Sequence, residues 1–274
     1  MKPTGHQGRA ELYFSRRGQQ TILHRHYTTL PAQVIRPFYE DGRRAYVYLL
    51  TPTGGMLGGD RLEIRIVLEP GAQVCLTTAS ATKVHPSAGA PAEQALVIEL
   101  SPGSCLEYLP EPTILFRGAR WRQHTAVHRA SDSRLLLVEG WSAGRVARQE
   151  VFQFSCLETM LEVFTAQRLS IFDRMRICPA TYPHQRLGLW AGRPHLLTVF
   201  LLQETPPTSP WLRAVQLELA DHAALAGLSQ LEASGMVARI LADDIEALTH
   251  VTHTLWQKIR EGLWGEPWNF WRKL

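Results

Sequence analysis

Five carboxylates in the first 150 residues stand where they could do chemistry. Glu107 and Glu111 lie four residues apart beside a proline-containing turn, Glu139 and Glu150 flank a loop of small residues, and Asp60 ends a run of glycines. Paired carboxylates can act as acid and base or hold a divalent cation. A solvated hairpin end is the commoner outcome of the same pattern, so the pairs alone do not decide between enzyme and metal site.

The most unusual string is residues 51–60, Thr-Pro-Thr-Gly-Gly-Met-Leu-Gly-Gly-Asp, which contains Gly54, Gly55, Gly58 and Gly59. Four glycines in six positions indicate positive φ or a close approach of the backbone to another group. No Gly-Lys-Ser/Thr follows, and the next segment alternates like a strand, which excludes a P-loop and a dinucleotide fingerprint. The alternative is a tight turn or bulge that leads into a strand.

A second block, residues 76–85, is small and polar and contains Thr78 and one of only four lysines, Lys83. It is either a surface that contacts a partner or a loop held by its own Ser and Thr hydrogen bonds. Arg145 lies between Glu139 and Glu150, and these three charges form either a buried polar cluster or simple surface charge.

Metal and nucleophile motifs are missing from the sequence. The three close histidine pairs have no Cys or carboxylate at a recognised ligand spacing: His24/His26, His124/His128 and His250/His253. With 11 histidines in the chain, such pairs arise by chance. No GxSxG, HExxH or kinase signature is present. We therefore expect no tightly bound cofactor and no catalysis.

Composition is that of an ordinary globular protein of 274 residues, with 20% charged residues and a net charge of +4. The charge is spread along the chain, which argues against nucleic-acid binding. Neither a secretory signal nor an apolar run long enough for a membrane is visible, which predicts a cytoplasmic protein. Four isolated cysteines are accordingly expected to be reduced and mostly buried, namely Cys75, Cys105, Cys156 and Cys178.

The first 200 residues alternate as β-strands do. A strand over 62–68, a Pro-Gly turn at 69–72 and a strand over 74–78 are echoed by 96–100, 101–104 and 105–109. Two hairpins or two rungs of a coiled β structure would both give this echo. Further strands are expected at 123–129, 134–139, 149–154 and 161–164.

The last 65 residues favour a mixture of helices and strands. Ser209 and Pro210 predict the start of a helix that ends near Gly227. Strands are expected over 228–233 and 236–241, then a helix that begins near Asp243 or Asp244 and ends at Gly262 or Gly265. Its predicted inner face is Ile245, Leu248, Thr252, Leu255 and Ile259. The aromatic tail, 264–271, folds back on the body or contacts a partner.

These elements predict a mainly β fold. The body, 1–205, is expected to be helically wound or stacked, and a C-terminal α+β portion, 206–274, with about two helices is expected to pack on it as one unit.

Taken in order, several blocks resemble the urease accessory protein UreD (UreH) family. They are Arg36–Tyr39, Tyr48–Asp60, Leu76–Lys83, Leu106–Ile114 with Phe116–Ala119, and Gly144–Arg145 with Glu150. The match covers residues 9–155 and continues more loosely to the end. It departs from the family pattern at 84–86, at 148–150 and at 269–272.

The resemblance implies a helically wound β protein that is not an enzyme. It implies a complex with UreF and the GTPase UreG on the urease apoprotein, with UreE as the indirect source of metal and only transient Ni²⁺ inside this chain. Because a conduit should bind metal weakly at several sites, the five carboxylates are the hypothetical nickel path: Asp60, Glu107, Glu111, Glu139 and Glu150. The motif residues expected to contact partners are Gly54, Gly55, Gly58, Gly59, Thr78, Lys83 and Arg145.

Two other functions stay open from the residues alone. One is a β-rich hydrolase that uses Glu107 with Glu111, or Glu139 with Glu150, as acid and base. The other is a basic nucleic-acid-binding module, which would show a steep salt dependence of affinity. The order of the motif blocks places the assembly factor ahead of both.

Overall fold

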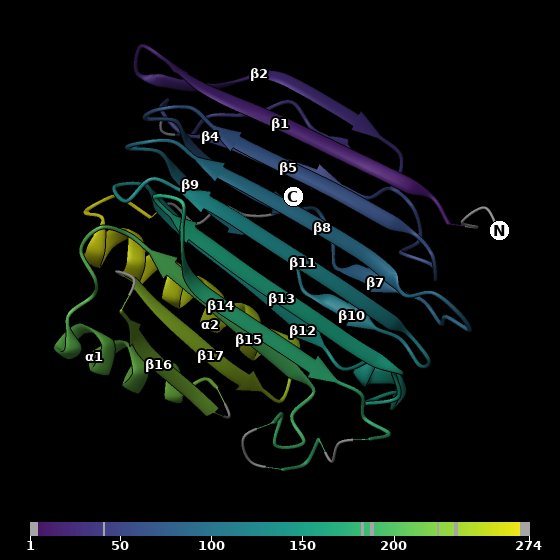
Figure 1. Ribbon diagram of the computed structural model, residues 1–274. Coiled ribbons are helices and arrows are strands. Elements are labelled where there is room, and N and C mark those ends of the chain that lie inside the picture. The colour runs from purple at the N-terminus through teal and green to yellow at the C-terminus, as the bar shows by residue number, and fades with distance from the viewer. Residues whose placement is uncertain are drawn as a thin grey trace.

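Two β-sheets stacked face to face form the body of the protein, and two α-helices cover the outer face of one sheet (Figure 1). The structure is a computed structural model that describes residues 5–40, 42–181, 184–186, 189–223, 225–232 and 235–268. One apolar core lies between the sheets, and a second lies between the other sheet face and the helices. The predicted mainly β, wound fold is confirmed.

The first sheet has seven strands in the order β14-β13-β11-β8-β5-β1-β2. The pairs from β1 to β13 are parallel, and the outermost pair at each end is antiparallel. The bounds are β1 Gln7–Arg17, β2 Gln20–Thr29, β5 Arg61–Leu68, β8 Ala92–Leu100, β11 Arg120–Arg129, β13 Cys156–Thr165 and β14 Arg168–Ile177.

The second sheet follows the order β16-β17-β15-β12-β9-β6-β4-β3, with the short strands β7 and β10 beside β12. Its strands are β3 Gln33–Val34, β4 Ala45–Leu50, β6 Gln73–Thr78, β7 Thr82–Val84, β9 Cys105–Leu109, β10 Thr113–Leu115, β12 Arg134–Ser142, β15 His195–Leu202, β16 Leu225–Leu231 and β17 Gly235–Ala242. Because β17 pairs with β15, the C-terminal portion extends the sheet of the body.

Successive strands alternate between the sheets, so the chain winds as a coil. β5 and β6 lie in different sheets, and each pairs in parallel with the strand one turn later, β8 and β9. The Pro-Gly turns stack as well, since the Gly71 amide donates to the Pro102 carbonyl at 3.0 Å and the Cys105 amide to Ala72 at 2.9 Å. The echoed sequence unit is therefore two rungs of a coil, and the hairpin alternative is wrong.

Alternation along the strands separates the two faces of the first sheet. Inward residues such as Leu62, Ile64 and Ile66 are at most 3% exposed, whereas outward residues are charged and pair across strands, as Arg65 does with Glu99 at 2.7 Å. An exposed pair contributes about 0–1 kcal/mol. The apolar layer between the sheets therefore provides most of the stability.

The helices begin at side-chain caps but end differently from the prediction. Thr208, and not Ser209, caps α1 (Ser209–Ala220), because its hydroxyl accepts the Trp211 amide. The helix ends well before Gly227, since β16 begins at Leu225. Asp244 caps α2 (Ile245–Lys258), as predicted, and a π-helical turn, η2 (Ile259–Leu263), continues it.

The inner face of α2 is only partly the predicted one. Leu248 and Leu255 are buried as expected, but Ile245 is 44% exposed because it lies in the first turn, ahead of the contact with the sheet. Val251 and Trp256 belong to the buried face instead. Tail residues Trp264 and Trp268 pack against the same core, so the described part of the tail folds back on the body, whereas 269–274 lie outside the described residues.

The predicted strand over 149–154 is wrong. A short 3₁₀ helix, η1 (Val146–Arg148), is followed by left-handed backbone at Gln149 and Phe152, with φ of 56° and 55°. Positive φ at two positions is incompatible with a strand. The segment is a compact loop between β12 and β13.

Two of the four cysteines form a disulfide, Cys156–Cys178, so the prediction of four reduced thiols is wrong. The antiparallel pairing of β13 with β14 places Leu157 opposite Ile177, which brings the adjacent cysteines to a Cα–Cα distance of 4.2 Å. Cys105 is a buried free thiol as predicted, and burial raises its pKa to about 11.

In the part of the chain that the structure describes, neither helix is long and apolar enough to cross a membrane.

Replacing Asp244 with Ala should lower the free energy of unfolding by about 1 kcal/mol, because the Asp244 carboxylate accepts the Ala247 amide at 2.7 Å. Urea denaturation measures the loss. Asp243→Ala is the matched control, since that neighbouring carboxylate pairs with Arg193 at the surface and caps no helix, and it should cost less. Equal losses would mean that Asp244 acts through charge and not as a cap.

Candidate functional site

The glycine-rich loop between β4 and β5 packs closely on residues 82–87. The Met56 amide donates to the Lys83 carbonyl at 2.7 Å, and a Cβ at Gly55 would lie 2.5 Å from that same oxygen. A Cβ at Gly58 would lie 2.3 Å from the Ser87 hydroxyl. Gly55 and Gly58 are thus required by the close approach of residues 82–87, whereas a Cβ at Gly54 would meet nothing within 4 Å. Contact of the four glycines with a partner stays a prediction.

Asp60 holds this loop together. Its side chain is nearly buried and accepts the amides of His6 and Leu57, both at 2.7 Å. A carboxylate that satisfies two backbone amides is a structural anchor. Asp60 therefore anchors the loop, and its place on the nickel path stays a prediction.

Glu111 lies at an interruption of the second sheet. β9 pairs with β12 as far as Tyr108↔Leu137, and pairing resumes only at Thr113↔Trp141. Between them, Pro110 and Pro112 supply no N–H. Residues 138–140 consequently have a ladder partner in β15 but none in β9 or β10.

A cavity lies on each side of this interruption, and both are lined by Pro110, Glu111, Val138 and Gly140. The cavity between the sheets measures about 30 Å³, and the cavity between the second sheet and α2 about 60 Å³. Because one water needs roughly 10–15 Å³, each can hold a few waters. Glu111 thus lines both small chambers, one on each face of the second sheet.

Thr78 orients the segment that carries Glu111. Its hydroxyl accepts the Glu111 amide at 2.8 Å and donates to the Ser80 carbonyl at 3.2 Å. The bond from Thr78 to Ser80 fits the second alternative for this block, a loop held by its own hydrogen bonds. Contact of Thr78 with a partner stays a prediction. Lys83 is exposed on β7 and faces solvent, so its contact with a partner stays a prediction.

Glu139 lines the chamber between the sheets. Gln123 donates to its carboxylate at 2.7 Å and Thr125 at 3.4 Å. Burial, assisted by the negative charge of Asp173, raises the pKa of Glu139 to about 7 although both hydrogen bonds oppose the shift. This carboxyl group therefore gains and loses a proton near neutral pH. Nothing in the sequence pointed to Gln123 and Thr125, because their partner lies on another strand.

Glu107 lies on β9, on the face of the second sheet that packs against α2, in a buried ion-pair network. It pairs with Arg44 at 2.7 Å and accepts the indole N–H of Trp256 at 2.5 Å. Glu266 of the tail also pairs with Arg44, at 2.7 Å. Burial disfavours the charge of Arg44, but the Glu107 and Glu266 carboxylates raise its pKa well above the ordinary value. The network fastens the C-terminal tail to the body.

Glu150 and Arg145 form an ion pair away from Glu139. Glu150 accepts both the Arg145 guanidinium and, at 2.6 Å, the Arg117 amide, and the bond from Arg145 lowers its pKa. A Cβ at Gly144 would lie 1.8 Å from the Glu150 carbonyl oxygen. The pair fixes the loop after β12. Three of the five carboxylates, Asp60, Glu107 and Glu150, are thus held in contacts that support the fold.

No group of three or more His, Cys, Asp or Glu residues within the described ranges is arranged to hold a metal ion. His24 pairs with Glu69 at 3.3 Å, and His124 with Glu162 at 2.8 Å. His253 lines the chamber under α2. Glu111 and His253 therefore line the same chamber without a third such ligand beside them among the described residues.

Comparison with known proteins decides the family. The family model described as UreD urease accessory protein matches residues 6–272. The chain belongs to the UreD urease accessory protein family. A urease accessory protein UreD of Deinococcus radiodurans is 33% identical, over 94% of this chain and 91% of the relative. The UreD protein of Pseudomonas putida (strain GB-1) is 32% identical, over 94% of this chain and 90% of the relative. The UreD protein of Klebsiella aerogenes is also 32% identical, over 96% of this chain and 94% of the relative. The resemblance found in the sequence is confirmed.

Replacing Glu107 with Gln should lower the free energy of unfolding by about 3–5 kcal/mol, because the half-buried Glu266 alone would then face the buried charge of Arg44 within this network. Urea denaturation gives the value. Glu99→Gln is the control, since it removes an exposed partner of Arg65 and should cost about 1 kcal/mol or less. A loss at Glu107 as small as the control would contradict a tightly packed buried network.

Replacing Glu139 with Gln should make stability less dependent on pH. In the wild type the pKa of Glu139 is about 7 in the folded protein, which is above its value in the unfolded chain. The protonated carboxyl group therefore adds its full contribution to folding stability below the unfolded pKa, and this contribution is lost as pH rises through about 7. Relative to wild type, the Gln variant should therefore be more stable near pH 8 than near pH 5. Urea denaturation at both pH values tests this, and an unchanged difference between wild type and variant would contradict a buried, protonatable Glu139.

Proposed function

We propose that this protein is a non-enzymatic assembly factor that passes Ni²⁺ to the urease apoprotein. In this proposal it acts in the cytoplasm, in a complex with UreF and the GTPase UreG, and UreE supplies the metal indirectly. Family membership supports the role in urease maturation. The interruption of the second sheet at Glu111, with a chamber on each side, supports the passage of nickel.

The chambers suit a hydrated cation that is bound only in passing. Carboxylate and imidazole both bind Ni²⁺, and Glu139, Glu111 and His253 follow one another from the space between the sheets to the space under α2. No chamber presents three such ligands at once among the described residues. Sparse ligands along a wet route favour exchange over trapping.

Protonation of Glu139 would help release of the cation. A pKa of about 7 means that a proton and a cation compete for the same carboxylate near neutral pH. Arrival of Ni²⁺ favours the ionised form, and its departure is assisted by a proton. The site thus binds a divalent cation reversibly without a large free-energy barrier to leaving.

The hydrolase alternative finds little support in this arrangement. Glu107 has no exposed surface, and its carboxylate is held by Arg44 and Trp256. Glu150 is held by Arg145, outside the chamber that Glu139 lines. Neither predicted pair therefore shares an accessible site, which acid–base catalysis requires.

Expressing a urease operon with and without this chain, and measuring nickel per purified urease active site, tests the assembly role. Urease that is nickel-poor and inactive without the chain, and restored by complementation, is the expected result. Normal nickel content and activity without the chain would contradict the role.

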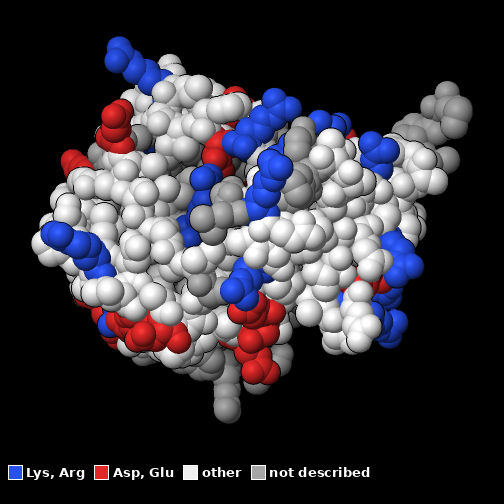
Figure 2. All heavy atoms as spheres, turned by 90° about the horizontal axis from the view of Figure 1, so that it is seen from below, with Lys and Arg blue, Asp and Glu red and all other residues white. Residues whose placement is uncertain are grey.

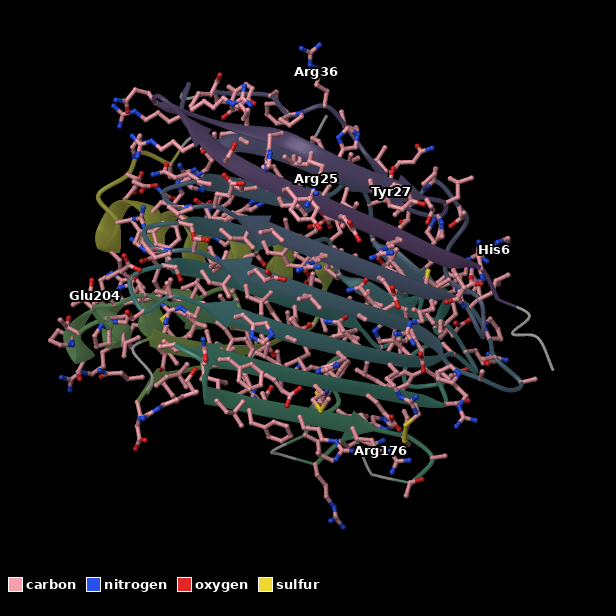
Figure 3. The ribbon with its side chains drawn as sticks, turned by 45° about the horizontal axis from the view of Figure 1, so that its top comes forward. His6, Arg25, Tyr27, Arg36, Arg176 and Glu204 are labelled. Atoms are coloured by element: carbon pink, nitrogen blue, oxygen red, sulfur yellow. A yellow bond between two sulfur atoms is a disulfide. The ribbon has the colours of Figure 1, made fainter. Side chains whose placement is uncertain are left out.

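The passage of nickel is tested separately by the double variant Glu111→Gln with Glu139→Gln, which removes charge from both chambers while keeping side-chain size. Nickel per urease site should fall severalfold, with complex formation unchanged. Glu204→Gln is the matched control, because Glu204 is exposed and lies away from the chambers (Figure 3). Full nickel loading by the double variant would contradict the conduit and leave the assembly role intact.

A further inference from the structure

The first sheet ends in an unpaired strand, β2. It pairs with β1 alone, and its two ends are covered where the Thr21 amide donates to Arg43 at 2.8 Å and the Thr29 carbonyl accepts Ala32 at 2.9 Å. Over 24–28, no described residue outside β1 hydrogen bonds to the backbone of this strand. Such an edge presents free N–H and C=O groups that can pair with another chain.

The exposed side chains of this edge are basic and aromatic. His24, Arg25, His26 and Tyr27 form a continuous exposed run in the middle of β2. Arg25 lies over the Tyr13 ring at 3.7 Å, and neither Arg25 nor Arg36 has a carboxylate partner among the described residues. Figure 3 shows Arg25, Tyr27 and Arg36 at one end of the molecule, with Arg36 extending away from the body. The edge therefore attracts negative charge.

An apolar groove runs beside this edge. A hollow of about 650 Å³ separates β2 from the segment after β3, with Ile22, Leu23, Val34 and Ile35 among its lining. Tyr27 is 53% exposed, and Ile35 is 43% exposed. Here the layer between the two sheets reaches the end of the coil, where a wound β structure needs a cap. The Arg36–Tyr39 block, which the nickel route does not use, forms one wall.

The other end of the same sheet differs. On edge strand β14, Asp173 pairs with Arg239, and Arg176 pairs with Glu158 at 3.0 Å. Figure 2, which views that end, shows acidic and basic side chains in separate small groups. Of the two edges of this sheet, as far as the structure describes them, the β2 edge is the one that combines an open backbone, a groove with apolar side chains and unmatched positive charge.

We propose that β2 is the docking edge for an extended acidic segment of a partner protein, which adds to the sheet as a further strand. Backbone hydrogen bonds give the segment its affinity, and alternate side chains select its sequence. Carboxylates of the segment meet Arg25 and Arg36, and its apolar side chains meet Ile22, Leu23 and Ile35 in the groove. This surface is independent of the proposed nickel route, because it shares no residue with the chambers around Glu111.

The probe is a blocked peptide as long as β2 in which Glu alternates with Val or Thr, and binding to the full chain is followed by fluorescence anisotropy. We expect it to bind at least about tenfold more tightly than the same peptide with Lys in place of Glu. Arg25→Glu with Arg36→Glu should weaken binding about tenfold. Arg168→Glu with Arg174→Glu, two exposed charges on β14, is the matched control and should bind like wild type. Circular dichroism confirms that both variants fold.

Hydrogen exchange distinguishes strand addition from simple charge attraction. The acidic peptide should slow exchange of backbone amides within 24–28, while amides of β14 stay unchanged. Absence of peptide binding, equal losses in the two double variants, or binding without slower exchange would each overturn the proposal. Single-stranded DNA that binds as tightly, with the same dependence on Arg25 and Arg36, would also overturn it and would assign the edge to nucleic acid.

Discussion

Parallel pairing of each strand with the strand one coil turn later is the constraint on which this structure depends. Because β5, β8 and β11 pair residue by residue, each coil turn must contain strands of matching length and turns of matching shape. The hydrogen bond from Gly71 to Pro102 shows the same matching at the corners. A residue inserted into one rung would turn inward side chains outward, so the coil tolerates irregularity only between strands.

The candidate site lies at an irregularity of this kind, in the segment between two strands. At Pro110–Pro112 the ladder between β9 and β12 stops for three residues, yet β12 stays fixed because β15 pairs with it along its whole length. On the far side of β9, pairing with β6 continues to Leu109. The opening therefore costs few hydrogen bonds, and the two prolines remove donors that would otherwise be left unpaired. A passage through a sheet is possible here because the neighbouring strands hold its edges.

Sequence patterns predicted the parts of the fold that depend on local alternation. The strand over 62–68 and its echo at 96–100 were recognisable because inward and outward residues alternate, and Asp244 was recognisable as a cap. The sequence pattern gave wrong predictions where tertiary contacts determine the local structure. Phe152 takes a positive φ that no local rule predicts, and the Cys156–Cys178 bond depends on which strands pair.

The same limit applies to the site. Pro110, Glu111 and Pro112 could be singled out as a rigid turn with a carboxylate, but that the turn opens a sheet depends on Val138–Gly140, which lie far along the chain. Glu107 and Glu111 are close in sequence but lie in different surroundings. Glu107, on strand β9, belongs to a buried ion-pair network, whereas Glu111, in the turn after β9, lines the chambers. Carboxylate spacing therefore identifies residues worth examining, while the strand ladder decides which of them lie in the buried ion-pair network and which line the chambers.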